Sequence, residues 1–484
     1  MNFYPSLEEA QKYTDYQQLP LSLSVPLDKS PMALCRILKN VSNNVFVLES
    51  CEDSSHWGRY SFLGYDPILE LTCQDHTVTI KQGMTFTHEN TNPHKFIRDL
   101  MAQHRSPRLS KLPTFTGGLV GYFAYEFMKY PEPRLDLPST DEEGFQDVDL
   151  MLFDKVIALD HLEQKMILMV QIPTEHLETN YNKGMETLKA METLLKTGME
   201  KEEKAGKLLA PLTPAFGETE FCDMVKTAQR HIIEGDIFQV VLSNRLSAPY
   251  EGSMFPVYEN LRRINPSPYL FYFSSQEVEI AGASPETLVK VEEGKVTTFP
   301  LAGTKPRGKT EEEDLALEKE LLADEKERAE HNMLVDLGRN DVGKVSRYGS
   351  VFVEKYMNIE RFSHVMHIGS TVCGTLKEDC DYLDALDAIL PAGTLSGAPK
   401  IRACEIIHDL ENLKRGIYGG AIGYIDYTGN MDTCIAIRLA FKKNNKVFVR
   451  SGAGIVADSV PESEYKECIH KAKAVVKAME VAEE

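Results

Sequence analysis

Short stretches of alternating apolar and polar residues recur along the chain, and stretches with helical spacing of apolar residues lie between them. In the first part, residues 44–50 and 59–81 alternate with a period of two, which predicts strands. Residues 147–172 predict a hairpin that turns at Asp160 and His161. Helical spacing predicts helices over residues 31–38, 93–105 and 175–195.

The second part of the chain mixes the two patterns in the same way. Residues 219–234 predict a helix, and Thr310 with Glu313 forms a capping-box pattern that starts a long acidic helix through Leu337. A last helix is predicted from Ser463 onward. Strands are predicted over residues 237–248, 269–274, 279–283, 287–298 and 351–376, with three more over residues 418–455. Because there is no regular βαβ alternation, the pattern favours an α+β fold with antiparallel sheets.

Residues 198–214 differ in composition from the segments on both sides. They read GMEKEEKAGKLLAPLTP, which is charged at first and then carries two prolines. Such a stretch is typical of a link between domains, because it offers few apolar residues to a core. We therefore expect an N-terminal region over residues 1–213 and a second region over residues 214–484.

Composition and charge narrow the class of protein further. The chain has 484 residues and a formal net charge of −20, which argues against nucleic acid as a partner. Its nine cysteines include no Cys-x-x-Cys pair, which predicts free thiols in a reducing compartment. The N-terminus lacks a signal pattern, and no apolar run approaches the length of a membrane span. We expect a cytoplasmic protein without a membrane partner.

A candidate binding site comes from the C-terminal stretch that starts at Gly452. Two glycines there allow backbone N–H groups to approach a ligand closely. On the following helix Glu464, Glu467 and Lys471 share one face, since they are three and seven residues apart. A second predicted helix carries two further carboxylates with the same spacing, at Glu327 and Glu330. Two such helices that meet would suit Mg²⁺, whereas a single pair is more typical of a solvated helix face.

Six stretches of the second region together resemble the chorismate-utilising enzymes. The resemblance extends from about Leu48 to the end of the chain and is dense after Thr219. It implies a chorismate-binding enzyme fold, an antiparallel β-sandwich with outer helices, with residues 214–484 as the catalytic region and residues 1–213 as the regulatory one. The stretches are PLAGTKPRG (300–308), DLGRNDVGKV (336–345), RFSHVMHIGS (361–370), LPAGTLSGAPKIRACEII (390–407), GIYGGAIGYIDYTGNMDTCIAIR (416–438) and the stretch over residues 452–471.

The family's branch that forms anthranilate, the first step of tryptophan biosynthesis, fits these stretches best. The resemblance implies that chorismate and ammonia give aminodeoxyisochorismate, which then yields anthranilate and pyruvate. It implies Mg²⁺ as the cofactor, with Glu330 and Glu467 as direct ligands and with Glu327 and Glu464 bound through water. The ion would neutralise the ring carboxylate and polarise the departing C4 hydroxyl.

The same resemblance assigns roles to further residues. Glu286 matches the general acid for the C4 hydroxyl, which requires a raised pKa. His367, rather than the nearby His364, matches the histidine that assists pyruvate elimination. From the sequence pattern alone, Glu286 could equally be a turn residue, and His367 could equally be a histidine of the core. The groups that would bind the substrate are Tyr418 and Arg438 at the enolpyruvyl carboxylate, the Gly452-Ala453-Gly454 backbone, Thr394 against the ring, and Lys471 near the ring carboxylate or the metal.

Two positions distinguish the sister activities of the family. Isochorismate and salicylate synthases carry a lysine that activates water where this chain has Gln239, and glutamine is not a base. Aminodeoxychorismate synthases of the folate pathway carry a nucleophilic lysine in place of Ala302. We therefore expect ammonia to attack directly. An aminodeoxychorismate synthase, or a subunit that binds chorismate without catalysis, remains as an alternative.

Two further partners follow from the resemblance. The sequence contains no Gly-x-Cys-x-Gly nucleophile elbow, so ammonia is free or comes from a separate glutamine amidotransferase subunit. Two segments resemble the family's pocket for L-tryptophan, a feedback inhibitor. A carboxylate, a hydroxyl and an apolar wall in these segments suit an amino acid. They supply Leu48, Glu49 and Ser50 from one segment and Asn265, Pro266, Tyr269 and Leu270 from the other.

Overall fold

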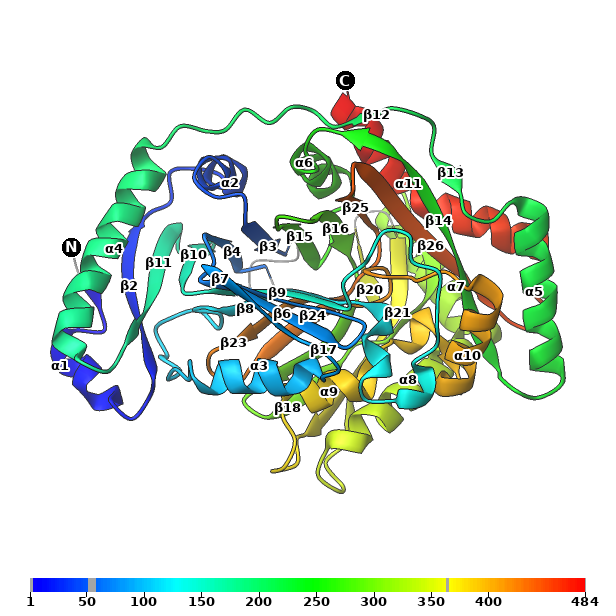
Figure 1. Ribbon diagram of the computed structural model, residues 1–484. Helices are drawn as coiled ribbons and strands as arrows, with labels where there is room; N and C mark the ends of the chain where they lie inside the picture. The colour runs from blue at the N-terminus through cyan, green and yellow to red at the C-terminus, as the bar shows by residue number, and fades with distance from the viewer. Residues whose placement is uncertain (1–2, 51–57, 363–364, 484) are drawn as a thin grey trace.

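The computed structural model describes residues 3–50, 58–362 and 365–483. Two large sheets pack against each other, and most helices lie outside them (Figure 1). Every pairing between named strands is antiparallel, including those of the longest strands. The predicted α+β fold is therefore confirmed. Among the described residues, none of the helices combines the length and the apolar character needed to cross a membrane.

The first sheet has 14 strands within the described residues. Its order is β1 (Phe3–Tyr4), β2 (Gln18–Pro26), β11 (Lys165–Pro173), β10 (Lys155–Asp160), β4 (Tyr60–Tyr65), β3 (Val45–Glu49), β15 (Tyr269–Ser274), β16 (Glu279–Ser284), β25 (Leu439–Lys443), β26 (Lys446–Ile455), β14 (Gln239–Glu251) and β12 (Lys207–Leu208), while β13 (Thr213–Pro214) and β22 (Gly397–Ala398) also pair with β14.

The second sheet has 12 strands within the described residues. Its order is β19 (Leu301–Pro306), β21 (Val365–Thr375), β18 (Lys295–Thr298), β17 (Thr287–Glu292), β24 (Met431–Ile435), β23 (Ala421–Asp426), β8 (Gly118–Phe123), β9 (Val148–Phe153), β5 (Leu69–Gln74), β6 (Thr77–Gln82) and β7 (Met84–His88), and β20 (Phe352–Arg361) pairs with β21.

Both sheets take strands from each side of the boundary that we predict at residue 213. In the first sheet β3 pairs with β15, so that Glu49 lies opposite Leu270. In the second sheet β8 pairs with β23. The segment 198–214 runs along the edge of the first sheet, where β12 and β13 pair with β14. The two regions thus share their sheets, and the division of labour between them stays a prediction.

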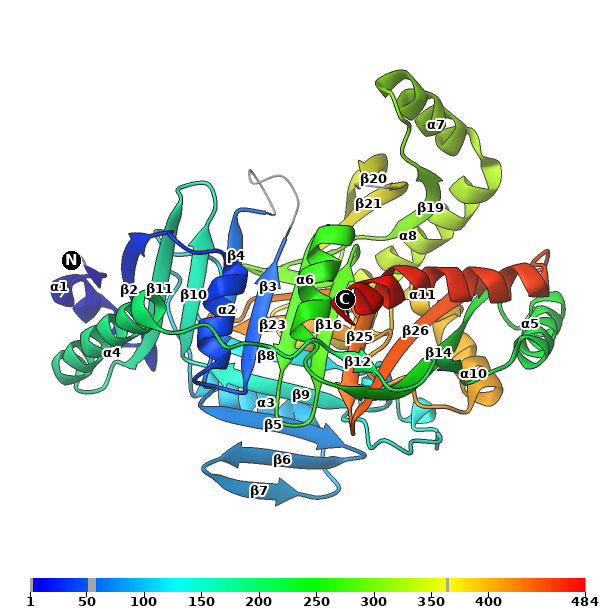
Figure 2. The same ribbon diagram turned by 90° about the horizontal axis from the view of Figure 1, so that it is seen from above.

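The helices cover the outer faces of the sheets and form one projecting lobe. Helices α2, α4, α5, α6, α10 and α11 contact strands of the first sheet, and α8 and α9 contact the second. Seen from above, α7 projects from the end of the second sheet that β19, β20 and β21 form (Figure 2). The helices are α1 (Leu7–Ala10), α2 (Pro31–Lys39), α3 (Pro93–Ala102), α4 (Leu177–Thr197), α5 (Glu218–Ile233), α6 (Phe255–Ile264), α7 (Glu311–Ala323), α8 (Glu325–Val345), α9 (Tyr382–Ile389), α10 (Lys400–Glu411) and α11 (Pro461–Glu483), with the 3-10 turns η1 (Gln11–Tyr13), η2 (Tyr125–Lys129), η3 (Pro133–Leu135) and η4 (Gly393–Leu395).

Three predicted elements differ in the structure, and the first is the hairpin over residues 147–172, which is instead the three strands β9, β10 and β11. The long acidic helix is divided into α7 and α8 at Asp324, whose backbone is extended and whose carboxylate accepts hydrogen bonds from the N–H groups of Lys326 and Glu327. This N-cap satisfies donors that a continuous helix would bond to its own carbonyls. Residues 418–455 form four strands instead of three, because Arg438 adopts a positive φ of 52° between β24 and β25.

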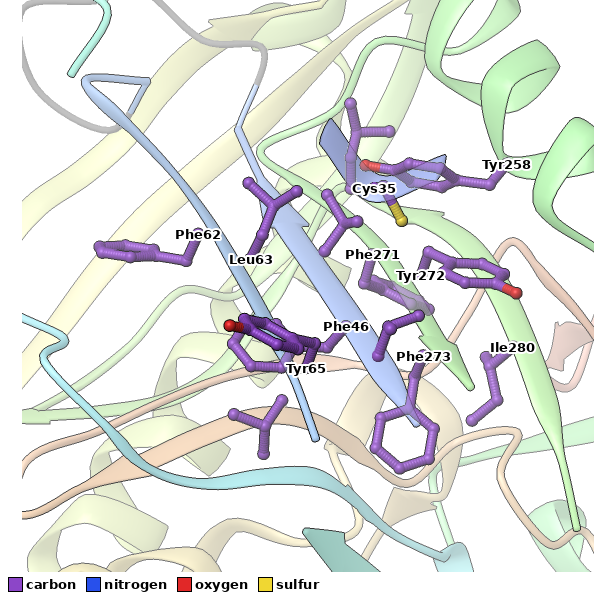
Figure 3. Close-up of a cluster of buried hydrophobic side chains, with 14 of the residues drawn as sticks. Cys35, Phe46, Phe62, Leu63, Tyr65, Tyr258, Phe271, Tyr272, Phe273 and Ile280 are labelled. Atoms are coloured by element: carbon purple, nitrogen blue, oxygen red, sulfur yellow. The ribbon is translucent and has the colours of Figure 1, made fainter. Parts of the chain in front are cut away.

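Aromatic side chains fill the space between the two sheets. Phe46 of β3 is fully buried and meets Phe153 of β9 edge-on, with ring centroids 4.7 Å apart. Figure 3 shows Phe46 among other buried rings, including Phe273 from the neighbouring strand β15. Burial of one such ring stabilises the fold by about 1.5–3 kcal/mol. This core fixes the two sheets against each other, and two of its rings, Phe62 and Phe271, line the second cavity described below.

Candidate active site

A cavity of about 630 Å³ lies where β14, β26, β19 and β21 meet helices α8 and α11. It brings together residues that are far apart in the sequence. Ala453 is the exception among the predicted site residues, since its side chain is fully buried in a core cluster on the other face of β26. The predicted residues that line the cavity are Gln239, Glu286, Glu327, Glu330, His367, Thr394, Tyr418, Arg438, Gly452, Gly454, Glu464, Glu467 and Lys471.

Glu286 lies in the short connection between β16 and β17 and is only 7% exposed. Thr394 Oγ1, from η4, donates to its carboxylate at 3.3 Å. Burial raises the pKa of Glu286 to about 8, although hydrogen bonds from Leu301 and Thr394 and the charge of Arg438 oppose the rise. The side chain is therefore protonated near neutral pH and can donate a proton, as a general acid requires.

His367 lies on β21 with its ring fixed against the β19 segment. Its Nδ1 lies 2.7 Å from the carbonyl oxygen of Gly303 and 3.1 Å from Thr304 Oγ1. A carbonyl only accepts hydrogen bonds, so Nδ1 carries the proton and Nε2 keeps its lone pair. Burial, together with the charges of Arg438 and Lys471, lowers the pKa of His367 to about 4, although the hydrogen bond with the Gly303 carbonyl opposes this fall. The ring is therefore a neutral base at neutral pH. The neighbouring His364 lies outside the described residues.

One end of the cavity is suited to an anion. Arg438 reaches it from its left-handed backbone position, which is a strained conformation for a residue with a side chain. A Cβ on Gly452 would lie 3.0 Å from the Tyr418 hydroxyl, and a Cβ on Gly454 would lie 2.7 Å from Gln239 Nε2. Glycine is required at 452, where a Cβ would also lie 2.7 Å from the backbone oxygen of Leu242, whereas at 454 a Cβ would only displace the movable end of Gln239.

The four carboxylates line the cavity from two helices. Burial and the charge of Glu330 raise the pKa of Glu327, and burial and the charge of Glu467 raise the pKa of Glu464. Lys471 Nζ lies 2.8 Å from Glu467. Crowded carboxylates of this kind fit a hard cation in their chemistry. They are not drawn into one ligand set, since no three Asp, Glu, His or Cys side chains within the described ranges lie close enough to hold a metal ion.

A second cavity, of about 440 Å³, lies between the two sheets. Of the predicted tryptophan residues, Asn265 and Pro266 do not line it; the lining of this segment begins at Pro268. Glu49 accepts hydrogen bonds from Tyr258 at 2.6 Å and from Arg262 at 3.0 Å, both on α6. The other five predicted residues line the cavity, namely Leu48, Glu49, Ser50, Tyr269 and Leu270.

Several lining residues of both cavities were not identified from the sequence. Thr304 and Arg450 belong to the active-site cavity, and Tyr424, Lys290 and Asp432 belong to the second. Most of these residues lie on strands, and the local sequence pattern there predicts a strand without indicating a functional role. A signal exists for Thr304, which lies within the stretch PLAGTKPRG, and for Tyr424 and Asp432, which lie within the stretch GIYGGAIGYIDYTGNMDTCIAIR.

Comparison with known proteins defines the class of this chain. The model of the chorismate binding enzyme family matches residues 45–477. The chain belongs to this family, which confirms the resemblance seen in its sequence and its nature as an enzyme.

Within the family, the chain is similar to proteins named anthranilate synthase component 1. The one from Acetivibrio thermocellus is 44% identical over 495 residues, covering 100% of this chain and 99% of that protein. The one from Aquifex aeolicus is also 44% identical, with the same coverage. A crystal structure of anthranilate synthase component I from Streptococcus pneumoniae is 40% identical, with a TM-score of 0.75 over 86% of this chain and 92% of that one. The menaquinone-specific isochorismate synthase of Escherichia coli, at 19% identity and a TM-score of 0.71, shares the fold.

The raised pKa of Glu286 generates a prediction that does not depend on activity. The folded state keeps this proton up to about pH 8, whereas the usual value for a glutamate is 4.5. Between these values the folded state binds more protons than the unfolded state, so this contribution to stability falls as pH rises. Relative to Glu286→Gln, wild-type stability should fall between pH 4.5 and 8 by at most about 1.4 kcal/mol per pH unit.

The measurement is urea unfolding of both proteins across this pH range. A difference in unfolding free energy that does not change with pH would show that Glu286 titrates normally.

Proposed function

We propose that the chain converts chorismate and ammonia into anthranilate and pyruvate, as the large subunit of an anthranilate synthase. The observation that carries this proposal is that Glu286 and His367 line the same cavity. Burial there keeps Glu286 protonated and His367 neutral. The reaction needs a proton donor in its first step and a base in its second. The relatives named above support the same reaction.

In the first step, ammonia attacks C2 of the ring and the C4 hydroxyl leaves as water with the proton of Glu286. Two lining residues favour ammonia as the attacking group. Gln239 stands at the cavity wall and cannot deprotonate water, and Ala302 carries no nucleophile. The product of this step is aminodeoxyisochorismate.

In the second step, Nε2 of His367 accepts the proton from C2 while the C–O bond to the enolpyruvyl group breaks. The ring becomes aromatic, and protonation of the released enolpyruvate gives pyruvate. Arg438 and Tyr418 hold the enolpyruvyl carboxylate at the anion end of the cavity, where an arginine fork is suited to a carboxylate. Thr394 supports the ring and fixes the Glu286 carboxyl.

The four carboxylates are assigned to Mg²⁺. Glu330 and Glu467 would hold it directly, and Glu327 and Glu464 through water. When bound, the ion neutralises the ring carboxylate and polarises the C4 hydroxyl. The mutual charge effects within each pair of glutamates support the assignment, because a cation between them relieves the repulsion.

A separate glutamine amidotransferase subunit, anthranilate synthase component II, is the proposed source of ammonia. The sequence carries no nucleophile elbow for glutamine hydrolysis. Cys373 does not replace it, since its side chain is fully buried within β21.

The second cavity is proposed as a site for inhibition by L-tryptophan. Its volume of about 440 Å³ and its mixed aromatic and charged walls suit an aromatic amino acid. Glu49 connects the cavity to α6 through Tyr258 and Arg262, and Asn260 of α6 donates to the carbonyl of Ala478 in α11 at 3.1 Å. Because α11 carries Glu464, Glu467 and Lys471, a ligand that shifts Glu49 can bias the active site.

The reaction itself gives the first prediction of this proposal. The purified chain with chorismate, Mg²⁺ and ammonium salts at raised pH should release anthranilate and pyruvate in equal amounts, since free ammonia is then abundant. Glutamine alone should give no product. Anthranilate fluorescence and a coupled pyruvate assay measure both. An aminated product without pyruvate would indicate an aminodeoxychorismate synthase, and use of glutamine by the chain alone would reveal an amidotransferase site within it.

The metal assignment predicts that Glu330→Gln and Glu467→Gln each lower Mg²⁺-dependent turnover by about 100-fold or more, because each removes a direct ligand. Stabilisation of the wild type by Mg²⁺ in thermal unfolding should also be lost. Glu462→Gln is the matched control, since Glu462 is an exposed residue of α11 outside the cavity lining. Full activity of Glu467→Gln at limiting Mg²⁺ would sink the assignment.

The regulatory proposal predicts that Ser50→Arg relieves inhibition by tryptophan with little change in uninhibited turnover, because a long side chain fills the second cavity. Asn265→Ala should leave inhibition unchanged, since Asn265 does not line that cavity. Initial rates against tryptophan concentration measure both. Indifference of the wild type to millimolar tryptophan, or equal sensitivity of Ser50→Arg, would contradict the proposal while leaving the catalytic one intact.

A further inference from the structure

A buried cluster of one carboxylate and two guanidinium groups lies behind the anion end of the active-site cavity. Glu411 of α10 accepts hydrogen bonds from Arg415 Nη2 at 2.6 Å and from Arg450 Nη2 at 2.6 Å. The backbone N–H of Ser243, on β14, donates to the same carboxylate at 2.8 Å. Glu411, Arg415 and Arg450 are each less than 5% exposed.

The cluster holds more positive than negative charge. Two cations share the single carboxylate of Glu411, and an unbalanced buried charge is costly unless an anion compensates it. The neighbouring cation Lys414 is paired with Asp147 at 3.1 Å. Glu126 accepts hydrogen bonds from backbone N–H groups at 415 and 416, and burial raises its pKa.

Arg245, which lies opposite Arg450 in the pairing of β14 with β26, has acidic neighbours of its own in Glu143, Asp141 and Glu142, which oppose the lowering of its pKa by burial.

Arg450 differs from Arg415 because it forms part of the cavity wall. Arg450 is a lining residue beside Tyr418 and Gly452, whereas Arg415 is not. Its Nε donates to Ser243 Oγ at 2.8 Å, and its Nη1 donates to the Lys414 carbonyl at 2.9 Å. These bonds hold the guanidinium rigidly, so its charge stays at the wall.

The same charges act on the tyrosine at that wall. Burial raises the pKa of Tyr418, and the charges of Arg415 and Arg450 oppose this rise. The Arg415 guanidinium lies 6.0 Å from the centroid of the Tyr418 ring, and positive charge near a phenol makes its hydroxyl a stronger hydrogen-bond donor toward an anion. The excess charge of the cluster thus acts on the cavity wall at Tyr418, and Arg438 lines the same cavity.

We propose that Arg450 is a specificity-determining residue, which supplies a second fixed positive charge for the enolpyruvyl carboxylate of the substrate and strengthens the hydrogen bond from Tyr418. It acts through its charge and through Tyr418 as a positioning residue, and it favours ligands that carry this carboxylate over ring compounds that lack it. The inference deepens the proposed function and rests on it.

The test compares Arg450→Gln with Arg245→Gln, which removes an arginine from the facing strand but not from the cavity wall. For Arg450→Gln, KM for chorismate should rise about 10-fold with kcat changed less than about 2-fold, as for the loss of one charge-assisted contact. The inhibition constant of anthranilate, which lacks the enolpyruvyl group, should stay unchanged. Arg245→Gln should change none of these values. A purely structural role would move both constants together or lower kcat.

An unchanged KM in folded Arg450→Gln, or an equal rise in KM and in the anthranilate inhibition constant, would overturn the proposal. If circular dichroism shows that this variant does not fold, Arg450→Lys replaces it. Its shorter reach should raise KM about 3-fold with the anthranilate constant unchanged, and an unchanged KM would again overturn the proposal.

Direct binding of chorismate, measured by calorimetry without ammonia, distinguishes a failure of the proposed function from a failure of the role of Arg450. Failure of the wild type to bind chorismate would overturn the proposed function itself. Normal binding by the wild type together with equally tight binding by Arg450→Gln would overturn only the role of Arg450.

Discussion

The antiparallel pairing of β14 with β26 is the contact on which the candidate active site depends. It runs from Val240 opposite Ile455 to Pro249 opposite Lys446, and it places Ser243 opposite Gly452. A slip of one residue would turn every side chain of one strand to the other face. The pairing thereby fixes Gln239 against Gly454, joins Ser243 to the Glu411 cluster, and sets the start of α11 at the end of β26.

Burial then sets the chemistry of the groups around this pair of strands. Desolvation disfavours the charged form of any group, so the same cause raises the pKa of Glu286 and lowers that of His367. One cavity thus holds a proton donor and a proton acceptor at the same pH. The same cavity is lined by two pairs of glutamates, one on α8 and one on α11. Within each pair, the charge of one glutamate raises the pKa of the other, and a cation would relieve this repulsion.

Much of the fold follows from local patterns, and the departures have identifiable causes. The stretches that alternate with a period of two are strands in the structure. The predicted acidic helix is divided at Asp324, because the carboxylate of Asp324 caps the N-terminus of α8. The two Glu-x-x-Glu pairs are visible in the sequence, but only the tertiary structure shows that both line one cavity. Arg450 carries no local signal, since it reads as one polar residue of a strand, and its importance comes from contacts with α10 and β14. The family motifs identified most site residues, because they report on chemistry that periodicity does not.

The central claim is that Glu286 and His367 serve two successive steps in one cavity. Product analysis of His367→Met by mass spectrometry, with chorismate, Mg²⁺ and ammonium, tests it most directly. Without the base of the second step, chorismate should still be consumed and aminodeoxyisochorismate should accumulate, with little anthranilate. Formation of anthranilate at the wild-type rate, with no intermediate detected, would show that His367 is structural and would contradict the account.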